Sequence, residues 1–365
     1  MSNNKNFDNE IITTAEAIRD GLLESALADK KVLFFAEGVC DPVPVFGTLA
    51  GLSSHINKNR LIEMPVAENG LIGIAIGCAV AGHRPIINLH RVEFALLAME
   101  QIINNAAKIA FMSGGVESVP LVIRMIVGRG WGQGPNHSQS LESFFAHIPG
   151  LKVIIPTFPG DSKGMIISAV KDNNPVIVIE NRWCHYLEGD VKKGYYLSPI
   201  DGPRVVREGS DYTIVASSYM TIEAMMAAKA LEKIKINIEI IDLRVLRPLN
   251  TNCIVKSVKK TGTLMTVDLG WVSYGIGAEI IASVITEDHI EFKCKPIRLG
   301  VASKPTPSSR GLVDGHYTNS VDIVKNICKS LNLGEEISKK AINIALIAIE
   351  NKPIDIPNTT FKGPF

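Results

Sequence analysis

Residues 60–89 read RLIEMPVAENGLIGIAIGCAVAGHRPIINL and hold a strand, a helix and a second strand in succession. The segments Arg60–Met64 and Pro85–Leu89 have the length and hydrophobicity of buried parallel strands. Between them, the spacing of apolar residues predicts a helix over about Gly70–Ala81. A unit of this kind predicts a layered α/β fold with a parallel sheet.

The same alternation extends in both directions. Further strands are predicted in the first half at Val32–Ala36, Val119–Val127, Lys152–Ile155 and Pro175–Glu180, and further helices after a cap at Thr13 or Thr14, at Ala95–Met112 and at Gly160–Lys171. In the second half, strands are predicted at Tyr212–Ala216, Asn237–Ile241, Thr263–Val267 and Glu291–Leu299, and helices at Thr221–Lys233, Asn252–Lys260, Gly275–Ile285 and Val321–Leu331. We therefore expect two parallel-sheet α/β domains.

The domain boundary is predicted where the hydrophobic period disappears. Around residues 186–208 the composition turns to Gly, Lys, Tyr, Pro and Asp, which is typical of a linker. We expect a first domain over residues 1–190, a linker over 191–205, a second domain over 206–332 and a tail over 333–365. The tail holds one apolar helix, Ala341–Glu350, followed by Pro353, Pro357 and Pro364, and is expected to lie on a surface as a strap.

Composition and charge exclude several classes of protein. Hydrophobic residues make up 46% and charged residues 21% of the 365, which is typical of a folded globular protein. The formal net charge of +1 gives no field to attract nucleic acid, and no apolar run is long enough to cross a membrane. The six cysteines are scattered without a Cys-x-x-Cys pair, which favours reduced thiols over a zinc site or disulfides. We therefore expect a cytoplasmic protein with no nucleic-acid or membrane partner.

Two segments could carry chemistry. Glu68 follows a predicted buried strand and precedes a helix, and the carboxyl ends of strands are where open α/β sheets hold ligands. The alternative is that Glu68 only favours the positive end of the helix dipole. The second segment, Gly128-Arg-Gly-Trp-Gly-Gln-Gly-Pro-Asn-His137, does not have the spacing of a phosphate-binding loop, but it presents His137 as an acid/base candidate. His137 could equally be an ordinary loop residue.

A series of motifs in a fixed order resembles one known family. They are Ala67-Glu68-Asn-Gly, Gly82-His-Arg-Pro-Ile, Glu93-Phe94, Glu100-Gln101-Ile102, Met112-Ser-Gly-Gly, Asn136-His137-Ser-Gln-Ser, Pro149-Gly-Leu-Lys-Val, Asp172-Asn-Asn-Pro-Val, Ile241-Asp-Leu-Arg and Gly275-Ile-Gly-Ala-Glu. Over about residues 13–331 the chain is similar to the beta subunit of the thiamine diphosphate-dependent 2-oxo acid dehydrogenases, which include pyruvate, branched-chain and acetoin dehydrogenases. The resemblance implies a transketolase-like pyrimidine-binding domain followed by a transketolase C-terminal domain.

The resemblance also implies roles for site residues. Glu68 matches the glutamate that contacts the ring nitrogen of the cofactor's aminopyrimidine, where a carboxylate helps the cofactor to lose its thiazolium proton. Phe94 matches an aromatic residue that lies against the aminopyrimidine, although it could be an ordinary core phenylalanine. His137 matches the active-site histidine that faces the cofactor and a small 2-oxo acid substrate. Ala169, Asp172 and Asn174 fall where some members bind a structural potassium ion.

A missing motif implies a partner. The family holds the diphosphate and Mg²⁺ with Gly-Asp-Gly and a later Asn, a set of hard oxygen ligands that this sequence lacks. The resemblance therefore implies that a separate alpha subunit supplies these ligands in an α2β2 heterotetramer.

The implied activity is decarboxylation of a 2-oxo acid and transfer of the acyl unit to a lipoyl group on an acyltransferase partner. The sequence departs from the family at Asn136, Glu100, Leu269 and Arg182-Trp-Cys-His-Tyr186, which leaves the substrate and the acceptor open. An acyloin-forming or transketolase-like carboligase, acting on an aldehyde or a sugar ketone, is the first alternative. A non-catalytic scaffold subunit is the second, and retention of both Glu68 and His137 argues against it.

Overall fold

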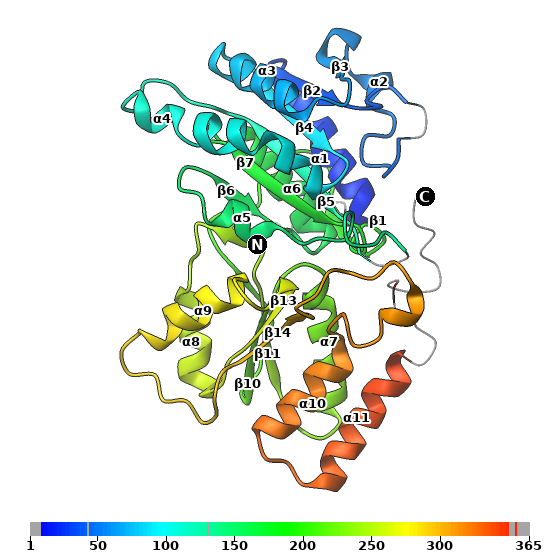
Figure 1. The fold of residues 1–365 in the computed structure, drawn as a ribbon, viewed down its shortest axis with the longest axis vertical. Helices are drawn as coiled ribbons and strands as arrows, with labels where there is room; N and C mark the ends of the chain where they lie inside the picture. Colours follow the sequence, from blue (N-terminus) through cyan, green and yellow to red (C-terminus); the bar gives the residue numbers. More distant parts are fainter. Residues whose placement is uncertain (1–8, 42–43, 130–131, 350–354, 356–365) are drawn as a thin grey trace, which may run out of the picture. The chain divides into compact units, whose positions relative to one another are not determined.

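A computed structural model describes residues 9–41, 44–129, 132–349 and 355 of the chain. The chain divides into two compact units (Figure 1). Unit 1 contains the described residues up to 127 together with 144–200, and unit 2 contains 128–143 and the described residues from 201 to 355. Within the described residues, no helix is both long and apolar enough to pass through a bilayer.

The core of unit 1 is a parallel sheet in the order β6-β7-β5-β4-β2-β3. Its strands are β2 (Val32–Ala36), β3 (Leu61–Glu63), β4 (Arg84–Leu89), β5 (Val122–Val127), β6 (Lys152–Ile154) and β7 (Val176–Asn181). Every residue of β5 and β7 is buried, as the continuous hydrophobicity of these segments predicts. The parallel α/β arrangement expected for this half of the chain is confirmed.

The long helices of unit 1 lie where the sequence predicts them. They are α1 (Thr14–Ala28), α2 (Leu52–His55), α3 (Glu68–Val80), α4 (Ile109–Met112) and α6 (Pro159–Lys171), while α5 (Glu142–Ala146) lies where the chain passes from unit 2 back to unit 1. Thr13 caps α1 through a capping box with Glu16, in which each side chain accepts from the other residue's backbone N–H. α1 packs along α6, and α3 packs against β4.

The prediction of a single helix over Ala95–Met112 is wrong. The chain instead forms a 3₁₀ helix, η2 (Val92–Ala98), a π-helical turn, η3 (Gln101–Ala106), and the short α4. Side-chain hydrogen bonds accompany these irregular turns: Asn105 Nδ2 donates to Gln101 Oε1 at 2.9 Å and Gln101 Nε2 donates to Glu100 Oε2 at 2.6 Å. Wide π turns of this kind are frequent at functional sites.

A two-stranded ribbon joins the beginning and the end of unit 1. β1 (Asn9–Thr13) pairs antiparallel with β8 (Glu188–Lys192). The expected linker, residues 191–205, therefore begins inside a strand, because paired backbone can hold a polar segment that has no hydrophobic period. The chain passes from unit 1 to unit 2 a second time between residues 200 and 201. The predicted domain bounds themselves stay a prediction.

Unit 2 has its own sheet in the order β14-β13-β10-β11-β9. Its strands are β9 (Arg204–Arg207), β10 (Tyr212–Ala216), β11 (Ile238–Asp242), β13 (Met265–Trp271) and β14 (Ile297–Val301), and the unit also contains the short strand β12 (Val245–Arg247). β9 runs antiparallel to β11, whereas the other neighbours in this sheet are parallel. The second parallel α/β domain is thus confirmed.

Helices α7 (Tyr219–Glu232), α8 (Asn252–Thr261), α9 (Ile276–Ile285), α10 (Ser320–Ser330) and α11 (Glu335–Ile349) surround this sheet, with a 3₁₀ turn, η4, at Arg310–Leu312. Figure 1 shows α10 and α11 beside α7, and both pack against it. α11 starts earlier than the tail helix predicted over Ala341–Glu350 and turns Ala341 and Ala345 inward; Glu350 and the three tail prolines lie outside the described residues. Beyond α11, Asp355 is 1% exposed and pairs with Arg310 at 3.0 Å.

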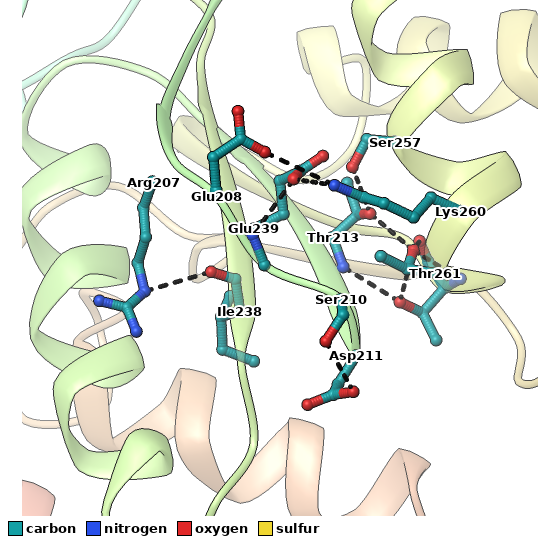
Figure 2. A network of polar contacts seen from close by, with 12 residues as sticks. Arg207, Glu208, Ser210, Asp211, Thr213, Ile238, Glu239, Ser257, Lys260 and Thr261 are labelled. Atoms are coloured by element: carbon teal, nitrogen blue, oxygen red, sulfur yellow. Dashed lines mark hydrogen bonds and ion pairs between the residues drawn. The ribbon is translucent and has the colours of Figure 1, made fainter.

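A polar network ties α8 to the amino ends of β10 and β11 (Figure 2). The Thr213 hydroxyl lies 2.7 Å from the hydroxyls of Ser257 and Thr261. Lys260 reaches from α8 to the buried carboxylate of Glu239 and bonds to it. Because parallel α/β sheets hold ligands at the opposite, carboxyl ends of their strands, we interpret this network as structural.

Candidate functional site

The carboxyl edge of the unit 1 sheet is where the fold places its ligand-binding loops. β3 ends at Glu63, and α3 begins five positions later at Glu68, so Glu68 lies in the connection that leaves this edge. α3 starts two residues before the predicted Gly70, which puts Glu68 in its first turn. Ala67 occupies the cap position and cannot bond the helix with its side chain.

Within the described residues, the carboxylate of Glu68 has no protein partner, although the residue as a whole is largely buried. The residue is only 4% exposed, and within the described residues no hydrogen bond or ion pair involves its side chain. A buried carboxylate normally requires such a partner, because loss of hydration is costly. The unsatisfied carboxylate therefore fits a ligand that carries a nitrogen donor, such as the aminopyrimidine of thiamine diphosphate.

Phe94 lies on an element that packs against the helix of Glu68. It belongs to η2, which contacts α3, and its side chain is half-buried. The neighbour of Glu68, Asn69, donates from Nδ2 to the carbonyl oxygen of Leu97 on η2 at 3.4 Å. The structure thus brings two of the predicted cofactor residues onto adjoining elements of one unit, and the hydrogen bond fixes the start of α3 against η2.

His137 belongs to unit 2, in the loop of residues 128–143. Its side chain is half-buried. Gly132 and Gly134 have φ angles of +80° and +68°, which favour glycine, and a side chain on Gly134 would collide with the Ser308 hydroxyl. Two further members of the predicted glycine motif, Gly130 and Trp131, lie outside the described residues.

The residues predicted to hold potassium are already engaged by protein groups. The Asp172 carboxylate bonds to the Lys152 ammonium and accepts from the backbone and side-chain nitrogens of Asn174, both at 2.9 Å. Burial raises the pKa of Asp172, but these hydrogen bonds outweigh burial and leave it below the usual range. Arg84 donates to the Asp172 carbonyl at 2.9 Å. The side-chain oxygens thus fit a cation poorly, and potassium binding at Ala169, Asp172 and Asn174 stays a prediction.

Sequence reasoning missed a buried ionic cluster next to the departure Arg182-Trp-Cys-His-Tyr186. Arg124 on β5 and Glu180 on β7 form a bidentate pair at 2.7 and 3.0 Å, with side chains no more than 1% exposed. His185 Nε2 lies 3.3 Å from Glu180, and Arg182 Nη1 lies 3.3 Å from His185 Nδ1. The signal that could have revealed the cluster was polar residues inside two otherwise apolar predicted strands.

A second missed feature is a pair of buried carboxyl groups in unit 2. Glu142 and Asp268 are 5% and 7% exposed, and the charge of Glu142 acts on Asp268. Glu142 looked like an ordinary acidic residue at a helix start, and no sequence pattern connects it with Asp268.

Two protein families match the chain over most of its length. The transketolase pyrimidine-binding domain matches residues 10–183, and the transketolase C-terminal domain matches residues 203–323. A split-gene transketolase, described as an inactive beta4 tetramer, has a similar structure, with a TM-score of 0.71 and 23% identity over 88% of this chain and 99% of its own. A transketolase from Leishmania mexicana has a TM-score of 0.62 and 16% identity over 90% of this chain and 46% of its own. These structural likenesses support the fold.

Curated relatives are more similar in sequence. The mitochondrial pyruvate dehydrogenase E1 component subunit beta of Bos taurus is 38% identical over 88% of this chain and 91% of its own length. The human protein is 36% identical over the same shares, and the subunit of Rickettsia felis is 35% identical over 87% of this chain and 98% of its own. The chain therefore belongs to the family of pyruvate dehydrogenase E1 component beta subunits, built from a transketolase pyrimidine-binding and a transketolase C-terminal domain.

Proposed function

We propose that the chain is the beta subunit of a thiamine diphosphate-dependent 2-oxo acid dehydrogenase of the pyruvate dehydrogenase type. It would decarboxylate a 2-oxo acid and pass the acyl unit to a lipoyl group. The observation that carries the proposal is Glu68, a largely buried residue at the carboxyl edge of the unit 1 sheet whose carboxylate has no hydrogen bond or ion pair within the described residues. Membership of the family supports the proposal independently.

Each proposed site residue has a separate task. When bound, thiamine diphosphate supplies the carbon nucleophile and takes up the electrons that decarboxylation releases. Glu68 would hold a proton at the ring nitrogen of the aminopyrimidine, and its burial would strengthen that hydrogen bond. Phe94 would pack against the ring and keep it near Glu68. His137 would orient the substrate carboxylate or move a proton on the substrate side.

We also propose that an alpha subunit completes the site in an α2β2 assembly. The support is the absence from this sequence of the Gly-Asp-Gly motif with its later Asn, which would otherwise supply Mg²⁺ and diphosphate ligands. A lipoyl acyltransferase is the proposed acceptor partner. A cytoplasmic location is proposed as well, since all six cysteines are free thiols in the structure.

Reconstitution tests the proposal. The purified full-length chain, with and without an alpha chain that carries Gly-Asp-Gly, is titrated with thiamine diphosphate and Mg²⁺ by calorimetry. We expect tight binding only with both chains present; equally tight binding by this chain alone would contradict the shared site. The reconstituted enzyme is then given a 2-oxo acid with either a lipoyl domain or an aldehyde. Transfer to the aldehyde alone would replace the proposed activity with carboligation.

A further inference from the structure

The missed carboxyl pair lies beside the loop that carries His137. Glu142 follows His137 within the same segment and begins α5, and its Oε2 accepts from the Ser140 hydroxyl at 2.6 Å. Asp268 lies in β13, where both of its carboxylate oxygens accept from the backbone N–H of Gly277 at 3.1 Å. The pair therefore joins three parts of unit 2: the His137 segment, β13 and the start of α9.

Three glycines make this junction possible. A Cβ atom on Gly270 would lie 3.2 Å from Glu142 Oε1 and 3.1 Å from the Ser140 carbonyl oxygen. Cβ atoms on Gly275 and Gly277 would lie 2.8 and 2.7 Å from Asp268 Oδ2. These approaches are too close for most side chains, so the backbone of β13 and α9 is shaped to receive the two carboxyl groups.

The charges around the pair do not neutralise two carboxylates. Burial raises the pKa of Glu142, and burial together with the charge of Glu142 raises the pKa of Asp268 to about 7. The Ser140 hydroxyl and the N–H groups of Glu142 and Gly270 act in the opposite direction on Glu142. The Gly277 N–H from α9 and the guanidinium of Arg298 from β14 do so on Asp268. Arg298 is exposed and donates to the Val272 carbonyl at 3.2 Å, so it compensates only weakly.

We propose that Glu142 and Asp268 are positioning residues that fix the His137 segment to β13 while the pair holds a proton, and release the segment when the pair becomes doubly charged. That the segment matters for catalysis rests on the proposed function. That the pair attaches the segment to β13 does not. The sign follows from proton binding: below neutral pH the folded pair holds a proton that the open or unfolded chain would release. The attachment is therefore strong in acid and is lost as the pH rises toward about 7.

Hydrogen exchange in the full-length chain, read by mass spectrometry, tests the proposal without any cofactor. After correction for the intrinsic exchange rate, we expect the protection of residues 132–143 to fall by up to about tenfold per pH unit as the pH approaches 7, and then to level off. Glu142→Gln and Asp268→Asn keep hydrogen-bonding atoms but remove one charge: Asp268→Asn should flatten this profile, and Glu142→Gln, which leaves Asp268 buried, should move the levelling-off to lower pH. Glu279→Gln, on the exposed side of α9, should leave it unchanged.

The outcomes separate this proposal from the proposed function. A flat wild-type profile, or an unchanged levelling-off pH in Glu142→Gln, overturns the pairing whatever the enzyme catalyses. If a variant does not fold, the profile of a His137→Gln chain still decides, because that substitution removes the imidazole that could titrate within the measured segment. In the reconstituted enzyme, the same variants should extend decarboxylation to higher pH; activity that never appears refutes the proposed function and leaves the exchange result standing.

Discussion

Removing either member of the Arg124–Glu180 pair should strongly destabilise unit 1, whereas removing both should not. Both side chains are essentially inaccessible, and Arg124 Nη1 has no hydrogen-bond partner within the described residues. Burial raises the pKa of Glu180, but Arg124 and His185 outweigh burial and hold it below the usual range, so the pair is charged. Glu180→Leu or Arg124→Met would leave one buried charge uncompensated, at a cost of about 3 to 5 kcal/mol.

The double variant removes both charges together. Only His185 then loses a partner, which costs about 1 to 3 kcal/mol for an unsatisfied buried polar group. The double variant should therefore be more stable than either single variant, in a domain whose total stability is roughly 5 to 15 kcal/mol.

Urea unfolding of the full-length chain measures these differences. The fluorescence of Trp183, which is 2% exposed in unit 1, reports on this unit once Trp131→Phe and Trp271→Phe remove the other two signals. Glu117→Gln, at an exposed position of the same unit, is the matched control and should change stability by less than about 0.5 kcal/mol. Losses that simply add in the double variant would refute the reasoning, because the two charges would then not depend on each other.

Three further predictions concern the site and the tail. Glu68→Gln should slow exchange of the cofactor's thiazolium proton in the assembled enzyme by about 100- to 10,000-fold, measured by NMR, and should leave the melting temperature unchanged. An unchanged exchange rate would mean that Glu68 only interacts with the helix dipole. His137→Ala should preserve that exchange but lower decarboxylation or acyl transfer by a similar factor, and full rates in both half-reactions would make it an ordinary loop residue. Arg310→Ala removes the ion pair of buried Asp355, so trypsin should cleave the tail sooner than in wild type; equal rates would show that the pair does not hold the tail.

The sequence predicted those parts of the fold that depend on repeated local patterns. Strands such as Val32–Ala36 and Tyr212–Ala216 were correctly placed because continuous apolar runs of that length fit a buried parallel sheet. The helix over Ala95–Met112 was not, since its apolar spacing does not distinguish a regular α-helix from the 3₁₀, π and α turns that the chain forms there.

The residues of the site also differ in whether a local sequence pattern reveals them. Glu68, Phe94 and His137 could be named because short motifs carry them. The carboxyl pair could not be found, because Glu142 and Asp268 are far apart in sequence and only the folding of unit 2 brings them together. The burial that raises their pKa values is likewise a property of packing, and no local pattern reports it.

Residues 128–143 interrupt the sequence of unit 1 and belong to unit 2. This excursion affects the order in which parts of the chain can fold during translation. β5 precedes this excursion and β7 follows it, after β6 and α6, and the two strands can pair as soon as β7 has left the ribosome. The strand that receives the excursion, β13, is made about 130 residues later, which is roughly 7 to 25 seconds at ordinary rates of translation. During that interval the loop lacks its contacts in the later part of unit 2, which include β13, Ser308 and Tyr317. A nascent chain halted before β13 should therefore show a folded first unit whose His137 loop is open to proteases.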